Sequence, residues 1–282
     1  MVPLTVVVLT LNEEVNIPLC LRSVSGWARD IFVLDSGSTD RTIELANAGG
    51  ATVFYRTFDN YAAQRRYAVS HLPIQTDWVL FLDADEAVSA PLKVEIDGII
   101  NQPSALNGYF IRLQFVFMKQ WIRHGGYDAC SKLVLFRKSK LVAIERDMDE
   151  LVIVEGPTRQ LTEYIIHQDR KPVRFWYEKH ARYTRFQVAD LVKSKHEKTL
   201  RWAEITNQRD RKRWVKEQVW GRIPVLLRPF LYFVYRYFLL LGFLDGRAGF
   251  IYHVSHAFLY QFMIAAVYID ERSRLPAAHE RR

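Results

Sequence analysis

One short stretch, residues 77–86, constrains this chain more than any other, because a buried apolar run ends there on paired carboxylates. Trp78–Leu82 is apolar throughout, and Asp83 and Asp85 follow it. Alternate residues of an extended chain point to the same side, so both carboxylates are expected to face one small volume. Open α/β sheets bind ligands outside the carboxyl ends of their strands, and oxygen ligands suit Mg²⁺ or Mn²⁺. An acidic turn after an ordinary strand is the competing interpretation.

The first 90 residues alternate between β-branched runs and segments with helical spacing, which predicts an α/β fold with a parallel sheet. The chain opens directly on a strand-like run with no basic segment before it, so we expect no signal peptide and a cytoplasmic start. Asn16 is expected to cap the first helix, and Ser38 or Thr39 the second. Strands are expected at residues 4–10, 31–34, 51–55 and 78–82, and helices at 16–26, 43–48 and 61–72.

The loop Asp35-Ser36-Gly37-Ser38-Thr39-Asp40 follows the second expected strand. A capped turn needs such residues for structural reasons alone. The functional interpretation is that Asp35 accepts hydrogen bonds from a nucleobase edge, with backbone N–H groups facing the ligand. The excess of 39 Lys and Arg over 31 Asp and Glu, a net charge of +8, favours an anionic partner.

Four motifs occur in the order and spacing found in the family 2 glycosyltransferases, which have the GT-A fold. They are Thr10-Leu11-Asn12-Glu13, Asp35 to Asp40, Gln64-Arg65 and Asp83-Ala84-Asp85. Within that family the chain resembles the bacterial lipopolysaccharide-core glucosyltransferases, most strongly over the first 90 residues. The resemblance implies a Rossmann-like, mostly parallel mixed sheet with flanking helices.

The resemblance also implies a UDP-sugar donor, UDP-glucose or another UDP-hexose, and a divalent cation, Mg²⁺ or Mn²⁺. By position, Asp85 is expected to bind the metal directly, with Asp83 near the ribose and the metal. His167 is either a further metal ligand or a structural histidine after a short strand. The residues expected to hold the nucleotide are Thr10, Asn12, Glu13, Asp35, Ser36, Arg65, Asp83 and Ala84.

The catalytic base of the family falls, by position, in the acidic segment 146–151. Relatives often have His-Glu there, whereas this chain has Asp149-Glu150. We favour Glu150 over Asp149, and a solvated helix start with no catalytic role stays open. Between these motifs, strands are expected at 108–119 and 132–137. The pair Gly125-Gly126 between them either borders the sugar or makes a hairpin turn.

After residue 170 the sequence becomes basic and rich in tryptophan, which is typical of helices lying on an anionic membrane surface. Single-stranded nucleic acid is the competing partner, but no recognised binding motif accompanies the charge, so we expect no nucleic acid. Residues 223–244 and 248–269 are apolar but interrupted. We expect two helices embedded in the cytoplasmic leaflet, over a spanning hairpin or a soluble helical pair. The predicted division is a catalytic domain, 1–170, and a membrane-associated helical region, 171–282.

Together these expectations describe an inverting, metal-dependent hexosyltransferase on the cytoplasmic face of the bacterial inner membrane, peripheral or monotopic. Its acceptor would be a hydroxyl of a lipid-linked saccharide, either a lipopolysaccharide core or a polyprenyl-diphosphate glycan. The alternatives are a polyprenyl-phosphate glycosyltransferase and a non-catalytic nucleotide-sugar-binding scaffold at the membrane.

Overall fold

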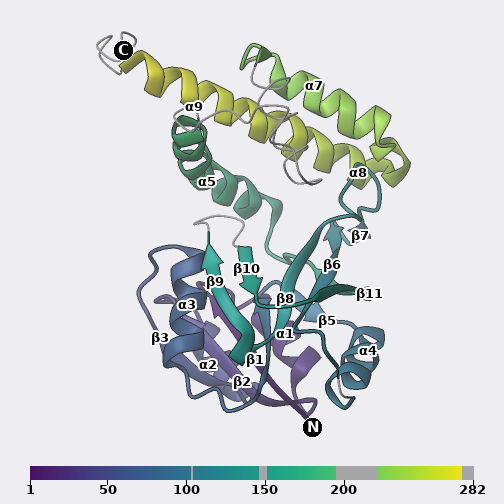
Figure 1. The fold of residues 1–282 in the computed structure, drawn as a ribbon. Coiled ribbons are helices and arrows are strands. Elements are labelled where there is room, and N and C mark those ends of the chain that lie inside the picture. The colour runs from purple at the N-terminus through teal and green to yellow at the C-terminus, as the bar shows by residue number, and fades with distance from the viewer. Residues whose placement is uncertain (103, 146–150, 195–221, 275–282) are drawn as a thin grey trace. The chain divides into compact units, whose positions relative to one another are not determined.

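The protein is described by a computed structural model that covers residues 1–102, 104–145, 151–194 and 222–274. It forms two compact units, Met1–Lys171 and Pro172–Arg282 (Figure 1). Each unit has its own hydrophobic cluster. The functional division into a catalytic part and a membrane-associated part stays a prediction.

A nine-stranded mixed sheet forms the centre of the first unit, in the order β3-β2-β1-β4-β8-β6-β11-β5, with β7 paired to β6. Strands β1 to β4 run parallel, whereas β8 is antiparallel to both β4 and β6. A separate two-stranded sheet pairs β9 with β10. The bounds are β1 Val2–Thr10, β2 Ala28–Asp35, β3 Thr52–Tyr55, β4 Trp78–Asp83, β5 Glu86–Val88, β6 Gly108–Phe117, β7 Gln120–Trp121, β8 Ser131–Arg137, β9 Leu141–Glu145, β10 Leu151–Val154 and β11 Thr158–His167.

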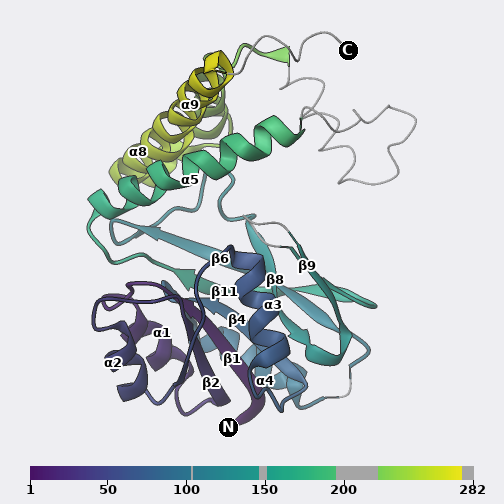
Figure 2. The ribbon, with the colours of Figure 1, turned by 90° about the vertical axis from the view of Figure 1, so that its left-hand side faces the viewer.

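Helices cover both faces of this sheet. The crossovers from β1 to β2 and from β2 to β3 move one way along the sheet, and the crossover from β3 to β4 moves back. Since such crossovers are right-handed, α1 and α2 lie on one face and α3 on the other (Figure 2). The helices are α1 Ile17–Val24, α2 Thr42–Ala48, α3 Tyr61–His71 and α4 Ala90–Ile100, with a 3₁₀ turn at Lys138–Lys140.

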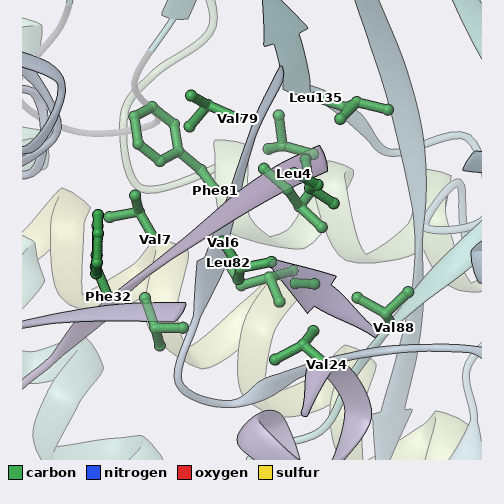
Figure 3. Close-up of a cluster of buried hydrophobic side chains, with 14 of the residues drawn as sticks. Leu4, Val6, Val7, Val24, Phe32, Val79, Phe81, Leu82, Val88 and Leu135 are labelled. Carbon is green, nitrogen blue, oxygen red and sulfur yellow. The ribbon is translucent and has the colours of Figure 1, made fainter. Parts of the chain in front are cut away.

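The core of the first unit is built on β1 and β4. Val6 and Val7 of β1 point to opposite faces, as do Phe81 and Leu82 of β4, and all four are buried. A strand that is covered on both faces needs apolar residues at every position, which explains the continuous runs in the sequence. Figure 3 shows these side chains packed with neighbours that include Val24 and Leu135.

The predicted N-cap residue of the first helix has the right position, whereas the prediction of Ser38 or Thr39 for the second helix was wrong. Asn16 occupies the N-cap position of α1, yet its side chain makes no capping bond and binds Glu13 and Asp169 instead. Helix α2 begins at Thr42, beyond Ser38 and Thr39. There the Asp40 carboxylate accepts bonds from the backbone N–H and the hydroxyl of Thr42.

The second unit is helical in its described parts. Val188 of α5 packs with Tyr260, Ile264 and Tyr268 in a small buried cluster. The segment Gly242–Arg274 is long and apolar enough to cross a membrane, judged by length and composition. Most of the predicted basic segment, residues 195–221, lies outside the described residues. The elements are α5 Val173–Ser194, α7 Arg228–Val234, a π-helix Tyr235–Leu239, a 3₁₀ turn Gly242–Asp245, α8 Gly246–His253, a π-helix Val254–Tyr260 and α9 Gln261–Arg274.

Candidate active site

The candidate site lies where β1, β2 and β4 end at one edge of the sheet. Thr10 is in register with Asp35, and Leu9 with Asp83. The loops after these three strands therefore leave the sheet at the same edge, as predicted from the alternation of strands and helices. Parallel strands with neighbouring carboxyl ends create the crevice in which α/β proteins bind ligands.

Asp35 organises the loop after β2. Its side chain is buried, and its two oxygens accept bonds from the Thr10 hydroxyl at 3.1 Å, from the Gly37 and Ser38 backbone N–H groups at 2.8 Å each, and from the Ser38 hydroxyl at 2.5 Å. Gly37 has a φ of +100°, which side-chain-bearing residues rarely adopt. The structural role of Asp35 is therefore well defined, and its contact with a nucleobase stays a prediction.

The loop after β1 is bound to the loop after β2 through Asn12. Its backbone N–H donates to the Ser38 hydroxyl at 2.8 Å, and its side-chain oxygen accepts from the Thr39 N–H at 2.8 Å. Asn12 has a φ of +56°, a conformation that asparagine tolerates better than most residues. Residues predicted to hold the uridine thus come from two loops that are fixed to each other.

Glu13, on the same loop, faces both a cation and an acid. Lys171 Nζ donates to one of its oxygens at 2.5 Å, and Asn16 Nδ2 donates to the other at 2.7 Å. Burial and then the charge of Asp85 raise the pKa of the Glu13 carboxyl above its usual value. Glu13 and Asp85 are therefore close enough to repel each other.

Helix α3 contributes two buried polar side chains, in accord with the motif Gln64-Arg65. Gln64 Nε2 donates to the Ser36 hydroxyl at 2.9 Å. Arg65, only 2% exposed, donates to Asp83 Oδ1 at 2.8 Å. Burial would raise the pKa of Asp83, but the charges of Lys132 and Arg65 outweigh it and hold that pKa well below its usual value. These two cations thus favour the ionised form of the partly exposed Asp83, and the neighbouring Ala84 is buried.

Asp85 and His167 lie close together, although 82 positions separate them in the chain. His167 Nδ1 is 3.7 Å from Asp85 Oδ1 and 3.6 Å from Glu86 Oε1. The antiparallel pairing of β5 with β11 sets Glu86 opposite His167. Burial disfavours the imidazolium, yet Asp85 and Glu86 together raise the pKa of His167 above its usual value. Both Glu86 Oε1 and His167 Nδ1 are buried, and neither has a hydrogen-bond partner of good geometry within the part of the chain that the structure describes.

These donors fit a hard divalent cation. Two ligands at about 2.1 Å from one cation lie about 3 to 4 Å apart, which the separations around His167 Nδ1 match. Among the residues that the structure describes, no three acidic, histidine or cysteine side chains form a ready metal cluster. Mg²⁺ does not require one, since it is commonly held by one or two carboxylates together with substrate phosphates.

The predicted catalytic pair Asp149-Glu150 lies outside the described residues. In β9, the strand that precedes this pair, the Ile144 carbonyl oxygen accepts a hydrogen bond from Arg66 of α3 at 2.6 Å. The end of β9 is thereby held to the helix that carries Arg65.

Three residues of the cluster were missed from the sequence. Glu86 directly follows the acidic motif but had been given no role. Lys132 Nζ lies 3.3 Å from Asp83 Oδ2, and Lys171 binds Glu13. Neither lysine belongs to a local motif, so only the pairing of distant segments reveals them.

This fold defines an α/β protein of the GT-A type, with a carboxylate cluster where its parallel strands end. Residues 5–96 match the model of glycosyl transferase family 2, and this match assigns that part of the chain to the family. The resemblance predicted from the four motifs is confirmed.

Curated relatives match about a third of the chain or somewhat more. An uncharacterized glycosyltransferase of Rickettsia typhi is 35% identical over 113 residues, which cover 39% of this chain and 38% of the relative. The lipopolysaccharide core biosynthesis glycosyltransferase LpsC of Rhizobium meliloti is 33% identical over 96 residues, which cover 32% of this chain and 34% of LpsC. The matched part therefore spans little more than a third of the length of each.

Among solved structures, glucosyl-3-phosphoglycerate synthase from Mycobacterium tuberculosis is similar. Its complex with Mn²⁺, UDP and glucosyl-3-phosphoglycerate aligns with 61% of this chain and 74% of the synthase, at 18% identity and a TM-score of 0.41.

Proposed function

We propose that the protein is an inverting glycosyltransferase that moves a hexose from a UDP-sugar to a hydroxyl of a lipid-linked saccharide. One observation carries the proposal. The strand ends bring Asp85 within 3.7 Å of His167, and the charge of Asp85 also acts on Glu13; Glu13 and Asp85 lie within the segment that matches family 2. Such a cluster suits the metal-bound diphosphate of a nucleotide sugar.

In this proposal Asp85 and His167 would hold the divalent cation, and a bound cation would supply positive charge to offset that of the diphosphate leaving group. Asp83, fixed by Arg65, orients the ribose, while Asn12 and Glu13 position the uracil. The bonds from Thr10 and Ser38 to Asp35 keep the uracil-binding loops in place before the donor arrives. Glucose is the hexose we favour, on the strength of the lipopolysaccharide-core resemblance.

A hydroxyl acceptor must lose a proton as it attacks the anomeric carbon. We assign that proton to the Glu150 carboxylate, with Asp149 as the alternative, and such general-base assistance contributes about 10² to 10⁴-fold. In an inverting displacement the base lies across the sugar from the leaving diphosphate, so it is not one of the metal ligands.

The second unit supports an acceptor at the membrane. Its described residues expose an unusual run of large apolar side chains between positions 226 and 250, and contiguous apolar surface of this kind marks a membrane or protein contact. We therefore place the protein on the cytoplasmic face of the inner membrane. The exposed residues are Leu226, Leu227, Phe230, Leu231, Val234, Tyr235, Phe238, Leu239, Leu241, Phe243, Leu244 and Phe250.

The test incubates the purified protein and membrane lipids with a panel of radiolabelled UDP-sugars, with and without a chelator. We expect label in the lipid fraction from one UDP-hexose, its loss with chelator, and a fall of at least about 100-fold for Asp85→Asn. Label that enters lipid equally well with chelator would contradict the metal-dependent mechanism.

Glu150→Gln separates the alternatives. A hydroxyl acceptor predicts a loss of about 10² to 10⁴-fold, whereas a polyprenyl phosphate acceptor, which needs no deprotonation, predicts little change. UDP binding without transfer to any lipid would support the scaffold instead.

A further inference from the structure

Lys132 is the second residue of β8, and its side chain reaches the acidic groups that follow β4. Its Nζ is 3.3 Å from Asp83 Oδ2 and 3.8 Å from Glu86 Oε1. The side chain is 32% exposed, so the ammonium lies at the boundary between the acidic cluster and solvent.

Two other cations of the cluster, Arg65 and Lys171, are less exposed than Lys132. Arg65 is buried, bonded to Asp83, and its guanidinium lies 5.0 Å from the centre of the Phe81 ring. Lys171 is paired with Glu13 at 2.5 Å. Lys132 differs from both, because a partly exposed lysine on a four-carbon stem can change its partner at little cost.

The ammonium also occupies space next to the metal donors. It approaches the same Glu86 oxygen that lies 3.6 Å from His167 Nδ1, and that nitrogen is 3.7 Å from Asp85 Oδ1. A divalent cation bound by Asp85 and His167 would therefore lie within a few ångström of the ammonium. Like charges at such a distance repel strongly where water is partly excluded.

We propose that Lys132 is a stand-in cation for the acidic cluster, which moves from Asp83 and Glu86 to the donor's diphosphate when the metal binds. This inference rests on the proposed function. Without nucleotide, Lys132 opposes metal binding. With nucleotide bound, the Lys132 ammonium pairs with the diphosphate and no longer repels the metal. Metal and donor therefore favour each other's binding through this one side chain.

The experiment uses the full chain and its Lys132→Met variant, which keeps the length of the side chain and removes its charge. Electron paramagnetic resonance of free Mn²⁺ gives the Mn²⁺ affinity with and without UDP, and calorimetry gives the UDP affinity at saturating Mn²⁺. We expect Lys132→Met to bind Mn²⁺ alone roughly tenfold more tightly and UDP roughly tenfold more weakly. These opposite changes distinguish the inference from a merely structural role, which would weaken both.

Two variants serve as controls. Lys132→Arg keeps the positive charge and should bind Mn²⁺ alone no more tightly than the unaltered protein. Lys140→Met removes a lysine that pairs with Glu155 in the same unit, and both affinities should stay unchanged. Where circular dichroism shows that Lys132→Met does not fold, Lys132→Gln takes its place.

Unchanged or weaker binding of Mn²⁺ alone by the uncharged variant overturns the inference, whatever happens to UDP. If the unaltered protein binds both ligands, that result leaves the proposed function standing. If the unaltered protein binds neither Mn²⁺ nor UDP, the proposed function fails and the inference fails with it.

Discussion

Asp83 and Asp85 are two positions apart, yet they have different surroundings. Asp83 neutralises a buried guanidinium, whereas Asp85 adds negative charge beside Glu13 and Glu86. Removing the partner of a buried charge costs more than the ion pair is worth, while removing one of several like charges costs little. Substitution of Asp83 should therefore lower the stability of the fold, whereas substitution of Asp85 should affect mainly the proposed metal binding.

We predict that Asp83→Asn lowers the free energy of unfolding by about 2 kcal/mol, less than for a fully buried pair because Asp83 is partly exposed. Asp85→Asn should change it by no more than about 0.5 kcal/mol, or increase it. Urea unfolding followed by fluorescence measures both. Asp59→Asn, which breaks the exposed pair with Arg56, is the control and should have little effect. Equal destabilisation by the two cluster variants would show that Asp85 has a structural role as well.

Site residues that follow a strand directly could be predicted from the sequence. Site residues whose partners are distant along the chain could not. The positions of Asp35, Asp83 and Asp85 at strand ends follow from short apolar runs and turn residues. Nothing near Lys132 or Lys171 distinguishes them from surface lysines, because their partners lie 49 and 158 positions away. The roles assigned to Glu150 and Asp149 stay predictions.

Among the elements, α3 has both a side-chain cap that contributes to stability and a residue, Arg65, that we propose contacts the nucleotide. Asn60 caps it by accepting a bond from the Ala63 N–H at 2.7 Å, and the first turns carry Gln64 and Arg65. Loss of such a cap typically costs about 1 kcal/mol, concentrated in the first turn. The side chains nearest the cap should therefore lose their alignment first.

We predict that Asn60→Ala lowers the unfolding free energy by about 1 kcal/mol and weakens UDP binding severalfold. Ser89→Ala is a matched control, because Ser89 caps α4 by accepting from the Leu92 N–H. It should cost a similar amount of stability and leave UDP affinity unchanged. Chemical denaturation and calorimetry test the pair. A loss of UDP affinity in both variants would mean that global stability, and not α3, controls binding.

Element order was predictable because β1 to β4 and their helices show clear apolar patterns. The short strands were not. β5 has three residues, too few for a periodic signal, and only its pairing with β11 defines it. That pairing brings Glu86 to His167. Because the sequence did not predict β5, it did not predict this contact either. Asn16 lies at its predicted N-cap position, but its side chain bonds to Asp169, and the Ser38 prediction failed because the Ser38 hydroxyl accepts from the Asn12 N–H of the neighbouring loop.

For the molecule as a whole, the exposed apolar run of the second unit supports the proposed membrane contact. Leu239 is 70% exposed and Leu244 is 55% exposed. Moving such a side chain from water to a lipid phase contributes about 1.5 to 3 kcal/mol. Two of them can therefore change membrane affinity by more than a factor of ten.

We predict that the double variant Leu239→Glu and Leu244→Glu binds vesicles containing acidic phospholipid at least about tenfold more weakly. Val94→Glu is the control, since Val94 is 72% exposed but lies in the first unit. Vesicle flotation measures the bound fraction. Undiminished flotation of the double variant would direct the search for the membrane contact to other residues.

The segment between β11 and the second unit has a practical consequence for anyone who shortens this polypeptide. Its Gln168 N–H donates to the Asp85 carbonyl, its Arg170 N–H to Asn16, and its Lys171 ammonium to Glu13. A fragment that stops at the histidine of β11, or even one residue before Lys171, discards the positive partner of Glu13. A fragment for crystallisation should thus extend past this lysine, because a shorter one would leave the partly buried Glu13 carboxylate without its cation.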